Sequence, residues 1–342
     1  MKKNLIALSL SLGGALLCAT GAQAQSSVQL MGLTDVFVGS MKNAGDAGSS
    51  KVVNSGGMTT SWFGFKGTED LGGGLKANFL LTSFFRADTG APGRFNGDPF
   101  FSRDANVGLS GNFGSVSLGR GMAPNFLPTI LLNPFGDSFT IAPLVLHANL
   151  GTTAVPGTTP ADTGWGNQVV YTTPVFGGLK ANLHYQFGEQ AGKGGKNNTG
   201  LNVMYFGGPL TVMGFYENAQ ISNPIQSLFG AKKTDWMVGG AYDFSVAKVY
   251  ATYGKAKTDG AGDDRKTFSL SGEVPVMNGV GAIKASVART KMDNTDVRRT
   301  TTSVGYDHNM SKRTDLYAVY MRDQLTGVNS GNSLILGIRH RF

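Results

Sequence analysis

The sequence predicts an all-β protein, a transmembrane antiparallel β-barrel of sixteen strands with a long third loop folded into it. Three observations support this fold class. Segments of about ten residues alternate between apolar and polar side chains, as membrane-spanning strands do. Short turns and longer polar loops follow one another in regular order. One long segment, residues 121–164, loses the alternation altogether.

The first 24 residues have the features of a cleaved secretory signal. Lys2 and Lys3 provide a positive start, residues 5–17 are mostly apolar, and residues 22–24 (AQA) fit a cleavage site. The apolar run is shorter than the ~20 residues of a spanning helix. Cys18, the single cysteine, falls in this segment. The barrel domain expected at 25–342 therefore has no disulfide, catalytic thiol or cysteine metal site.

Each strand is expected to have one lipid face and one lumen face. The segment 29–38 separates its side chains into two sets, Leu30, Val36 and Val38 against Leu33, Asp35 and Phe37. The last segment, 332–342, does the same, with Leu334, Leu336, Ile338 and Phe342 against Ile335, Arg339 and Arg341. Because a charged side chain facing the bilayer midplane costs about 2–4 kcal/mol, the arginines are assigned to the lumen or the interface.

Counting connections gives the number of strands. Seven short turns alternate with eight longer loops, one of them near 218–233, and fifteen connections join sixteen strands. The second strand is expected at 58–67 and the next at 75–86. Short turns at one end of the strands and longer loops at the other are typical of an outer-membrane barrel. Closure of the sheet gives every backbone polar group in lipid a hydrogen-bond partner. An exported soluble β-sandwich or β-solenoid is the alternative. A sandwich rarely needs so many even strands, and the sequence shows no repeated solenoid motif.

Composition and charge narrow the function. The 50 glycines and 41% hydrophobic residues suit short strands better than a helical bundle. The net charge is +8, or +6 once the two signal lysines are subtracted, and the charges are scattered, which with export argues against a nucleic-acid partner. On the lumen parity, basic residues outnumber acidic ones and predict a mildly positive lumen: Lys66, Lys76, Arg86 and Lys180 against Asp35.

The inner loop, as we call residues 121–164, is proline-rich and too long to be an idle connection in a compact domain. We expect it to fold into the barrel and narrow it. Catalysis is not expected, because His147 has Asp137 and Ser138 nearby in sequence but nothing resembles a nucleophile turn. No ligand spacing predicts a metal, and we expect no cofactor. A blocked structural barrel or adhesin would need a plug domain or very long outer loops, which the sequence lacks.

Seven motifs together resemble one family, the trimeric general porins of Gram-negative outer membranes, in particular their beta-proteobacterial type. The motifs span the mature chain: 61–67 (SWFGFKG), 69–77 (EDLGGGLKA), 107–111 (VGLSG), 117–120 (SLGR), 133–137 (NPFGD), 311–317 (SKRTDLY) and 337–342 (GIRHRF). The resemblance implies a homotrimer in contact with outer-membrane lipids and lipopolysaccharide. It also implies insertion by the barrel assembly machinery, for which Phe342 resembles the family's terminal signal.

The same resemblance implies passive diffusion of small hydrophilic solutes and ions through an eyelet, with a mild preference for anions. Arg120 matches an eyelet arginine, whereas Trp62 and Leu33 stand where relatives have basic residues. Asp137 is the only carboxylate between Arg120 and Asp162. Apolar loop residues such as Phe126 and Phe135 predict either a loop anchored on the inner wall, against Leu33, Leu80 and Phe84, or an apolar eyelet. The latter would make a specific channel for small amphipathic or aromatic anions.

Overall fold

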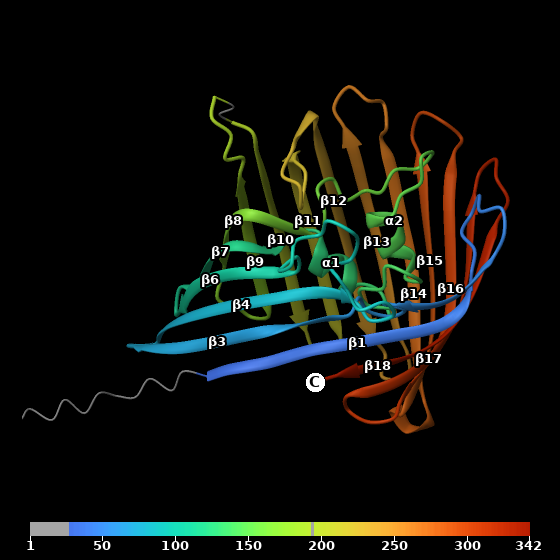
Figure 1. Ribbon diagram of the computed structural model, residues 1–342, viewed down its shortest axis with the longest axis horizontal. Coiled ribbons are helices and arrows are strands. Elements are labelled where there is room, and N and C mark those ends of the chain that lie inside the picture. The colour runs from blue at the N-terminus through green and yellow to red at the C-terminus, as the bar shows by residue number, and fades with distance from the viewer. Residues whose placement is uncertain (1–26, 193–194) are drawn as a thin grey trace, which may run out of the picture.

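The computed structural model describes residues 27–192 and 195–342, so the signal expected at 1–24 lies outside the described residues. Figure 1 shows one sheet curved into a barrel with the inner loop inside it. The strands are β1 (Ser27–Met41), β2 (Ser50–Ser55), β3 (Trp62–Gly72), β4 (Leu75–Arg86), β5 (Ala91–Pro92), β6 (Asp104–Gly111), β7 (Gly114–Met122), β8 (Gly164–Thr172), β9 (Leu179–Phe187), β10 (Asn197–Gly207), β11 (Leu210–Ile221), β12 (Leu228–Asp243), β13 (Lys248–Thr258), β14 (Arg265–Val276), β15 (Gly281–Met292), β16 (Arg298–Asn309), β17 (Thr314–Leu325) and β18 (Gly331–Arg341). The helices are α1 (Phe126–Leu131), α2 (Pro143–Asn149) and the 3₁₀ turn η1 (Met277–Gly279).

The barrel closes where β1 pairs antiparallel with β18, from Leu33 opposite Arg341 to Ser40 opposite Leu334. On its other edge β1 pairs with β3 and then with β2. These two segments are thus one wall strand, interrupted at residues 56–61. The two-residue β5 pairs only with the end of β4, inside a loop. Eighteen segments therefore build a wall of sixteen strands, and the predicted number of strands is confirmed.

The alternation of side chains follows the predicted parity. Leu30 and Val38 of β1 are each 54% exposed on the outside, whereas Asp35 between them is fully buried inside. Leu336 is 55% exposed on the outside of β18, and its neighbour Ile335 is buried. The outer face is thus apolar along these strands, as lipid requires. Within the described chain, no helix has the length and apolar character to cross a membrane.

Two predicted boundaries were wrong. The second strand was expected to begin at Met58, but residues 56–61 leave the wall because their backbone amides turn to Asp35. A long loop was expected at 218–233, but β11 and β12 occupy most of it. Asn218 and Gln220 point outward there, beside the buried Ala219 and Ile221, so the apolar outer face that marks a strand in lipid is missing.

Candidate functional site

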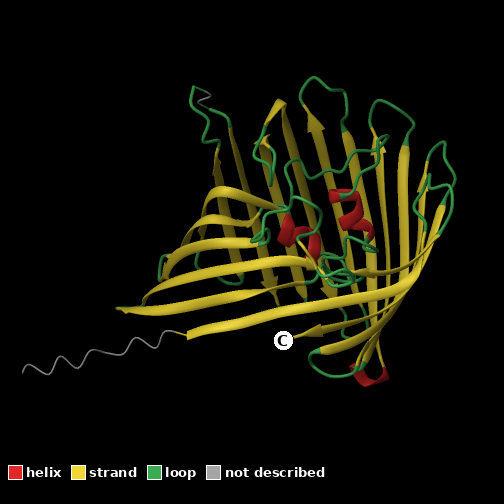
Figure 2. Ribbon diagram, in the orientation of Figure 1, coloured by secondary structure: helices red, strands yellow, loops and turns green. Residues whose placement is uncertain are grey.

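The inner loop leaves the wall after β7 and returns at β8, and both of its short helices lie inside the barrel (Figure 2). Pro143 stands at the start of α2, where its missing N–H costs nothing. The side chain of Asn133 accepts a hydrogen bond from the backbone N–H of Phe135 at 2.9 Å and donates to the carbonyl of Thr129. Proline and asparagine thus give this segment turns and short helices in place of a strand.

One side of the inner loop is anchored in apolar contacts with β1, β17 and β18. Phe135, Ile141 and Val145 are almost completely buried there. Their partners on the wall are Phe37, Tyr317, Val319, Met321 and Ile335. Fully burying a large apolar side chain contributes about 1.5–3 kcal/mol, so this cluster fixes the middle of the loop.

The other side of the inner loop is anchored on β10 to β13. Leu132 and Leu144 are buried in a second cluster. Their partners there are Met204, Met213, Phe215, Met237, Ala241 and Tyr250. The wall residues that we expected to receive the loop, Leu33, Leu80 and Phe84, belong to neither cluster. Anchoring therefore occurs further along β1, on β17 and β18, and on β10 to β13, because methionines and aromatic residues turn inward there.

Polar contacts add to this anchoring. The two ring nitrogens of His147 lie 2.7 Å from the hydroxyl of Thr290 and 2.9 Å from that of Thr301. A neutral imidazole has one donor and one acceptor, and two hydroxyls can satisfy both. The guanidinium of Arg299 donates to the carbonyl of Leu150 at 2.5 Å. These contacts bind α2 to β15 and β16.

His147 predicts a pH dependence of stability. Burial, followed by the nearby Arg299, lowers the pKa of His147 from 6.5 to about 3, although Asp323 opposes this. In the unfolded chain the imidazole takes up its proton below about pH 6.5, whereas in the native protein it stays neutral until about pH 3. The stability due to this group is therefore lost as the pH falls through that window. We expect the midpoint of thermal unfolding to fall less between pH 7 and pH 4 in His147→Gln than in wild type; equal falls would contradict this.

Asp35 was expected to be a lumen charge, but it lies beneath the excursion of residues 56–61. Its carboxylate accepts hydrogen bonds from the backbone N–H groups of Gly57, Met58 and Thr59 at 2.8–3.1 Å, and from the hydroxyl of Tyr317. The excursion in turn receives the inner loop, because the hydroxyl of Ser138 donates to the carbonyl of Gly57 at 2.6 Å. Asp35 thus holds residues 56–61 in the position in which they contact the inner loop.

Arg120 lies at the start of the inner loop and is only 9% exposed. Its guanidinium donates to the carbonyls of Ser102 and Gly164 and lies 3.5 Å from a carboxylate oxygen of Asp162. The register between β7 and β8 shifts at this point, which interrupts the regular alternation. Arg120 therefore joins the end of the loop at residues 87–103 to the end of the inner loop, and Asp162 partly balances its charge.

The second long loop, residues 87–103, contributes charges that sequence reasoning missed. Arg94 pairs with Asp98 at 2.9 Å and with Asp162 at 2.8 Å. Burial disfavours the charged guanidinium, but the hydrogen bonds that it donates to these carboxylates outweigh this effect and raise the pKa of Arg94 above its ordinary value. With Arg120 they form a cluster of two cations and two anions. The i, i+4 spacing of Arg94 and Asp98 was the signal that could have revealed part of it.

Trp62 of β3 and Leu33 of β1, two residues that were expected at the eyelet, lie directly opposite each other. Trp62 also faces Phe84 of β4, so the inner wall is apolar here. The guanidinium of Arg103 lies over the indole of Trp62, 4.1 Å from its centroid. A loop arginine therefore brings a cation to this part of the wall, although Arg103 also pairs with Asp104 at 2.9 Å.

The remaining predicted loop residues are less open to the lumen than expected. Phe126 is 8% and Phe135 1% exposed, so both pack in the interior. Leu131, at 42%, is the exposed member of this stretch. Asp137 is partly buried, and burial raises the pKa of its carboxyl.

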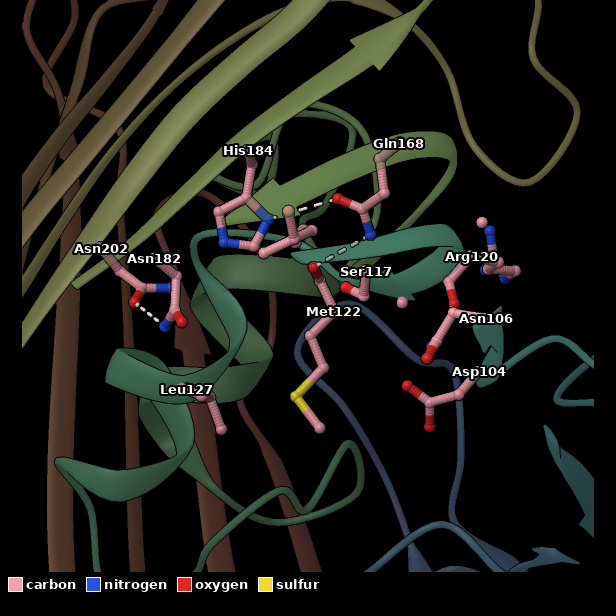
Figure 3. A pocket seen from close by; sticks show the side chains of 14 residues that line it. Asp104, Asn106, Ser117, Arg120, Met122, Leu127, Gln168, Asn182, His184 and Asn202 are labelled. Carbon is pink, nitrogen blue, oxygen red and sulfur yellow. Dashed lines mark hydrogen bonds between the residues drawn. The ribbon is translucent and has the colours of Figure 1, made fainter. Parts of the chain in front are cut away.

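The wall from β6 to β10 remains open beside the inner loop and forms a cavity of about 160 Å³. Figure 3 shows its polar lining, in which the ring of His184 approaches Gln168 and Asn182 approaches Asn202. Gln168 also donates to the carbonyl of Met122 at 3.3 Å. Amides therefore dominate this lining, and its carboxylate, Asp104, is paired with Arg103.

The predicted basic residues lie on this same side of the barrel. Lys66, Lys76 and Lys180 take the inward parity of β3, β4 and β9, and form no ion pair within the described chain. Arg86, at the end of β4, lines a second cavity of about 420 Å³. It donates to the side-chain oxygen of Asn96 at 2.8 Å, while its buried Nε has no partner among the described residues.

This second cavity joins aromatic and basic side chains. Its lining includes Phe85, Phe95, Phe139, Arg86 and Arg94. It lies between the end of β2 with the excursion of residues 56–61, the second long loop and the inner loop. The side of the barrel that is left open by the inner loop is therefore neutral to basic. No set of three or more His, Cys, Asp or Glu side chains suited to a metal ion occurs in the described residues.

Comparisons with known proteins agree with this architecture. The model of the Gram-negative porin family matches residues 8–327. The chain is 34% identical to outer membrane porin protein 32 of Delftia acidovorans and 29% identical to an outer membrane porin protein of Bordetella pertussis, over 100% of each chain in both cases.

Solved structures match as well. The anion-selective porin from Comamonas acidovorans has a TM-score of 0.76 and 30% identity, covering 93% of this chain and 100% of that one. A trimer form of OmpT from Vibrio cholerae has a TM-score of 0.67 at 16% identity, covering 93% and 99%, and shows the fold alone.

Proposed function

This chain belongs to the Gram-negative porin family, and from that premise we propose that its passage prefers anions and that three copies form a homotrimer. As a porin of the outer membrane it forms a channel for passive diffusion of small hydrophilic solutes and ions. Its relatives are channel proteins rather than enzymes. The anion preference is a property in the name of one relative, from Comamonas acidovorans.

The observation that carries the anion preference is an imbalance of unpaired charge along the open wall. Lys66, Lys76 and Lys180 have no ion-pair partner among the described residues, and on β3, β4 and β9 only Asp70, opposite Lys76 in the register, is an unpaired inward carboxylate. Asp104 and Asp162 are each paired with arginine. A passage lined by cations lowers the energy of an anion in transit. Arg120 is a less effective filter than its position in the sequence suggests, because Asp162 faces it.

Further parts of the proposal rest on the family. Residues 1–24 are removed as a signal, and Phe342, which is 44% exposed on the lipid face, acts as the recognition signal for the barrel assembly machinery. Outer-membrane lipids and lipopolysaccharide surround the barrel. Of the six predicted constriction residues, Arg120, Trp62 and Leu33 shape the wall, Asp137 lies on the loop, and Phe126 and Phe135 hold the loop in place.

The zero-current potential in a potassium chloride gradient tests the anion preference. Wild type is expected to prefer chloride, and Lys66→Gln/Lys76→Gln to lose much of that preference, because a charge about 4 Å from an ion contributes about 1 kcal/mol, or fivefold, in water. Arg120→Ala is expected to change conductance more than selectivity. Lys312→Gln/Arg313→Gln, in an exposed turn, is the matched control. A preference abolished by Arg120→Ala alone would contradict this assignment.

A specific channel for small amphipathic or aromatic anions is the second candidate, and the 420 Å³ cavity favours it. Phe85, Phe95 and Phe139 offer an apolar surface, and the unpartnered Nε of Arg86 offers a donor for a carboxylate. Such sites combine apolar walls with a few placed polar groups. Repeating the bilayer measurement with potassium benzoate and potassium acetate distinguishes the candidates, since only a specific site makes millimolar benzoate reduce the chloride current more than acetate does.

A further inference from the structure

Four basic residues stand in one row on the outside of the barrel, across β13 to β16. Lys255 pairs with Lys266, Lys266 with Lys291, and Lys291 with Arg298 in the strand register. Residues directly opposite each other in an antiparallel pair point to the same face. Like charges in that position destabilise a sheet. We call these four residues the basic row; at about 4.8 Å between strands it extends roughly 14 Å.

The basic row lies just on the loop side of an aromatic band. Tyr253 and Phe268, two residues nearer the middle of β13 and β14, face each other and are 41% and 49% exposed on the outside. Aromatic residues of this kind mark the boundary between hydrocarbon and head groups. Longer loops mark the outer side of such barrels, so the row lies at the head groups of the outer leaflet. Charges cost little at that depth.

Acidic neighbours neutralise only one half of the basic row. Lys255 lies 3.0 Å from Asp264 and 3.4 Å from Asp293, and Lys266 lies 3.1 Å from Asp293. Lys291 and Arg298 are exposed and form no ion pair with any described residue. Arg289, the next outward residue of β15, is exposed as well.

Isolated outward cations occur at the same level elsewhere, such as Lys51 of β2, which lies opposite Ser40 in the register. What distinguishes β15 and β16 is that Lys291 and Arg298 face each other directly, with Arg289 two residues away on the same strand as Lys291. An anion from the membrane would relieve the repulsion within the row.

We propose that Arg289, Lys291 and Arg298 bind phosphate groups of a phosphorylated glycolipid in the outer leaflet. The inference rests on the proposed contact with lipopolysaccharide and adds the surface and the chemical group that make it. A guanidinium binds phosphate oxygens in a bidentate manner, and Lys291 supplies a point charge beside it. The length of the row accommodates more than one phosphate on a single head group.

The test is the binding of bisphosphorylated lipid A to the folded protein in neutral detergent micelles, followed by fluorescence anisotropy of a labelled lipid. Lipid A without phosphates but with the same acyl chains is the comparison. Wild type is expected to prefer the phosphorylated lipid. Lys291→Gln/Arg298→Gln is expected to weaken that binding roughly thirtyfold, since each cation near an anionic surface contributes about fivefold. Lys312→Gln/Arg313→Gln removes the same charge at the opposite end of the barrel and is expected to bind as wild type.

Equal binding of both lipids, or an equal loss in the two double variants, would overturn the proposal. Single-channel conductance is measured on the same preparations. It is expected to be unchanged, because the substituted side chains face outward, so failure of lipid binding and failure of channel function remain distinguishable. If the double variant does not fold, Lys291→Arg/Arg298→Lys must retain binding and Arg298→Gln alone must lose about fivefold, which is again the effect of one cation.

Discussion

Phe135→Ala is expected to release the middle of the inner loop and to raise the conductance of the channel. The side chain of Phe135 is 1% exposed and lies in the cluster that includes Phe37, Tyr317 and Val319. Truncating a buried phenylalanine costs about 3–5 kcal/mol, partly through the cavity that remains. The truncation mainly weakens the docking of the inner loop on the wall, because the strands of the barrel keep all their hydrogen bonds.

Single-channel recording and thermal unfolding measure the two sides of this effect. We expect Phe135→Ala to give larger and more variable open currents, with a lower unfolding midpoint. Leu131→Ala is the matched control, since Leu131 belongs to the same loop but is 42% exposed. An unchanged, quiet current in Phe135→Ala would mean that polar contacts such as that of His147 hold the loop by themselves.

The closed barrel could be predicted from the sequence because lipid imposes a simple rule on every strand. Leu334, Leu336 and Ile338 must face outward, and Arg339 and Arg341 then face inward by parity. The predicted strand at 75–86 coincides with β4. Alternation is a local property, so no knowledge of distant contacts was needed.

The interior could be predicted only in part, because its contacts join residues far apart in the chain. The sequence indicated that the inner loop folds inward, but it gave no sign that Arg120 would meet Asp162 or that Arg103 would stack on Trp62. Parity correctly placed Asp35 inside. It could not reveal the excursion of residues 56–61, which depends on the three-dimensional match between one carboxylate and three amides.

The neutral variant Asp35→Asn is expected to disconnect this excursion from β1. A carboxylate accepts every hydrogen bond offered to it, whereas an amide turns an NH₂ group toward at least one of the donors Gly57, Met58 and Thr59. Hydrogen bonds to a charged group contribute about 1.5–3 kcal/mol each, so we expect a loss of about 3 kcal/mol or more in the free energy of unfolding.

The effect should reach the channel through Ser138 and Thr140, whose hydroxyls donate to the carbonyls of Gly57 and Gly56 at 2.6 and 2.7 Å. If the excursion moves, the inner loop loses these acceptors, and flickering currents are expected in a planar bilayer. Tyr317→Phe removes one donor to Asp35 and should show a smaller effect, while Asp46→Asn, in an exposed loop, should show none. Should Asp35→Asn lower stability but leave the current steady, the excursion would support the wall alone, and the anchoring of the inner loop would rest on its apolar clusters.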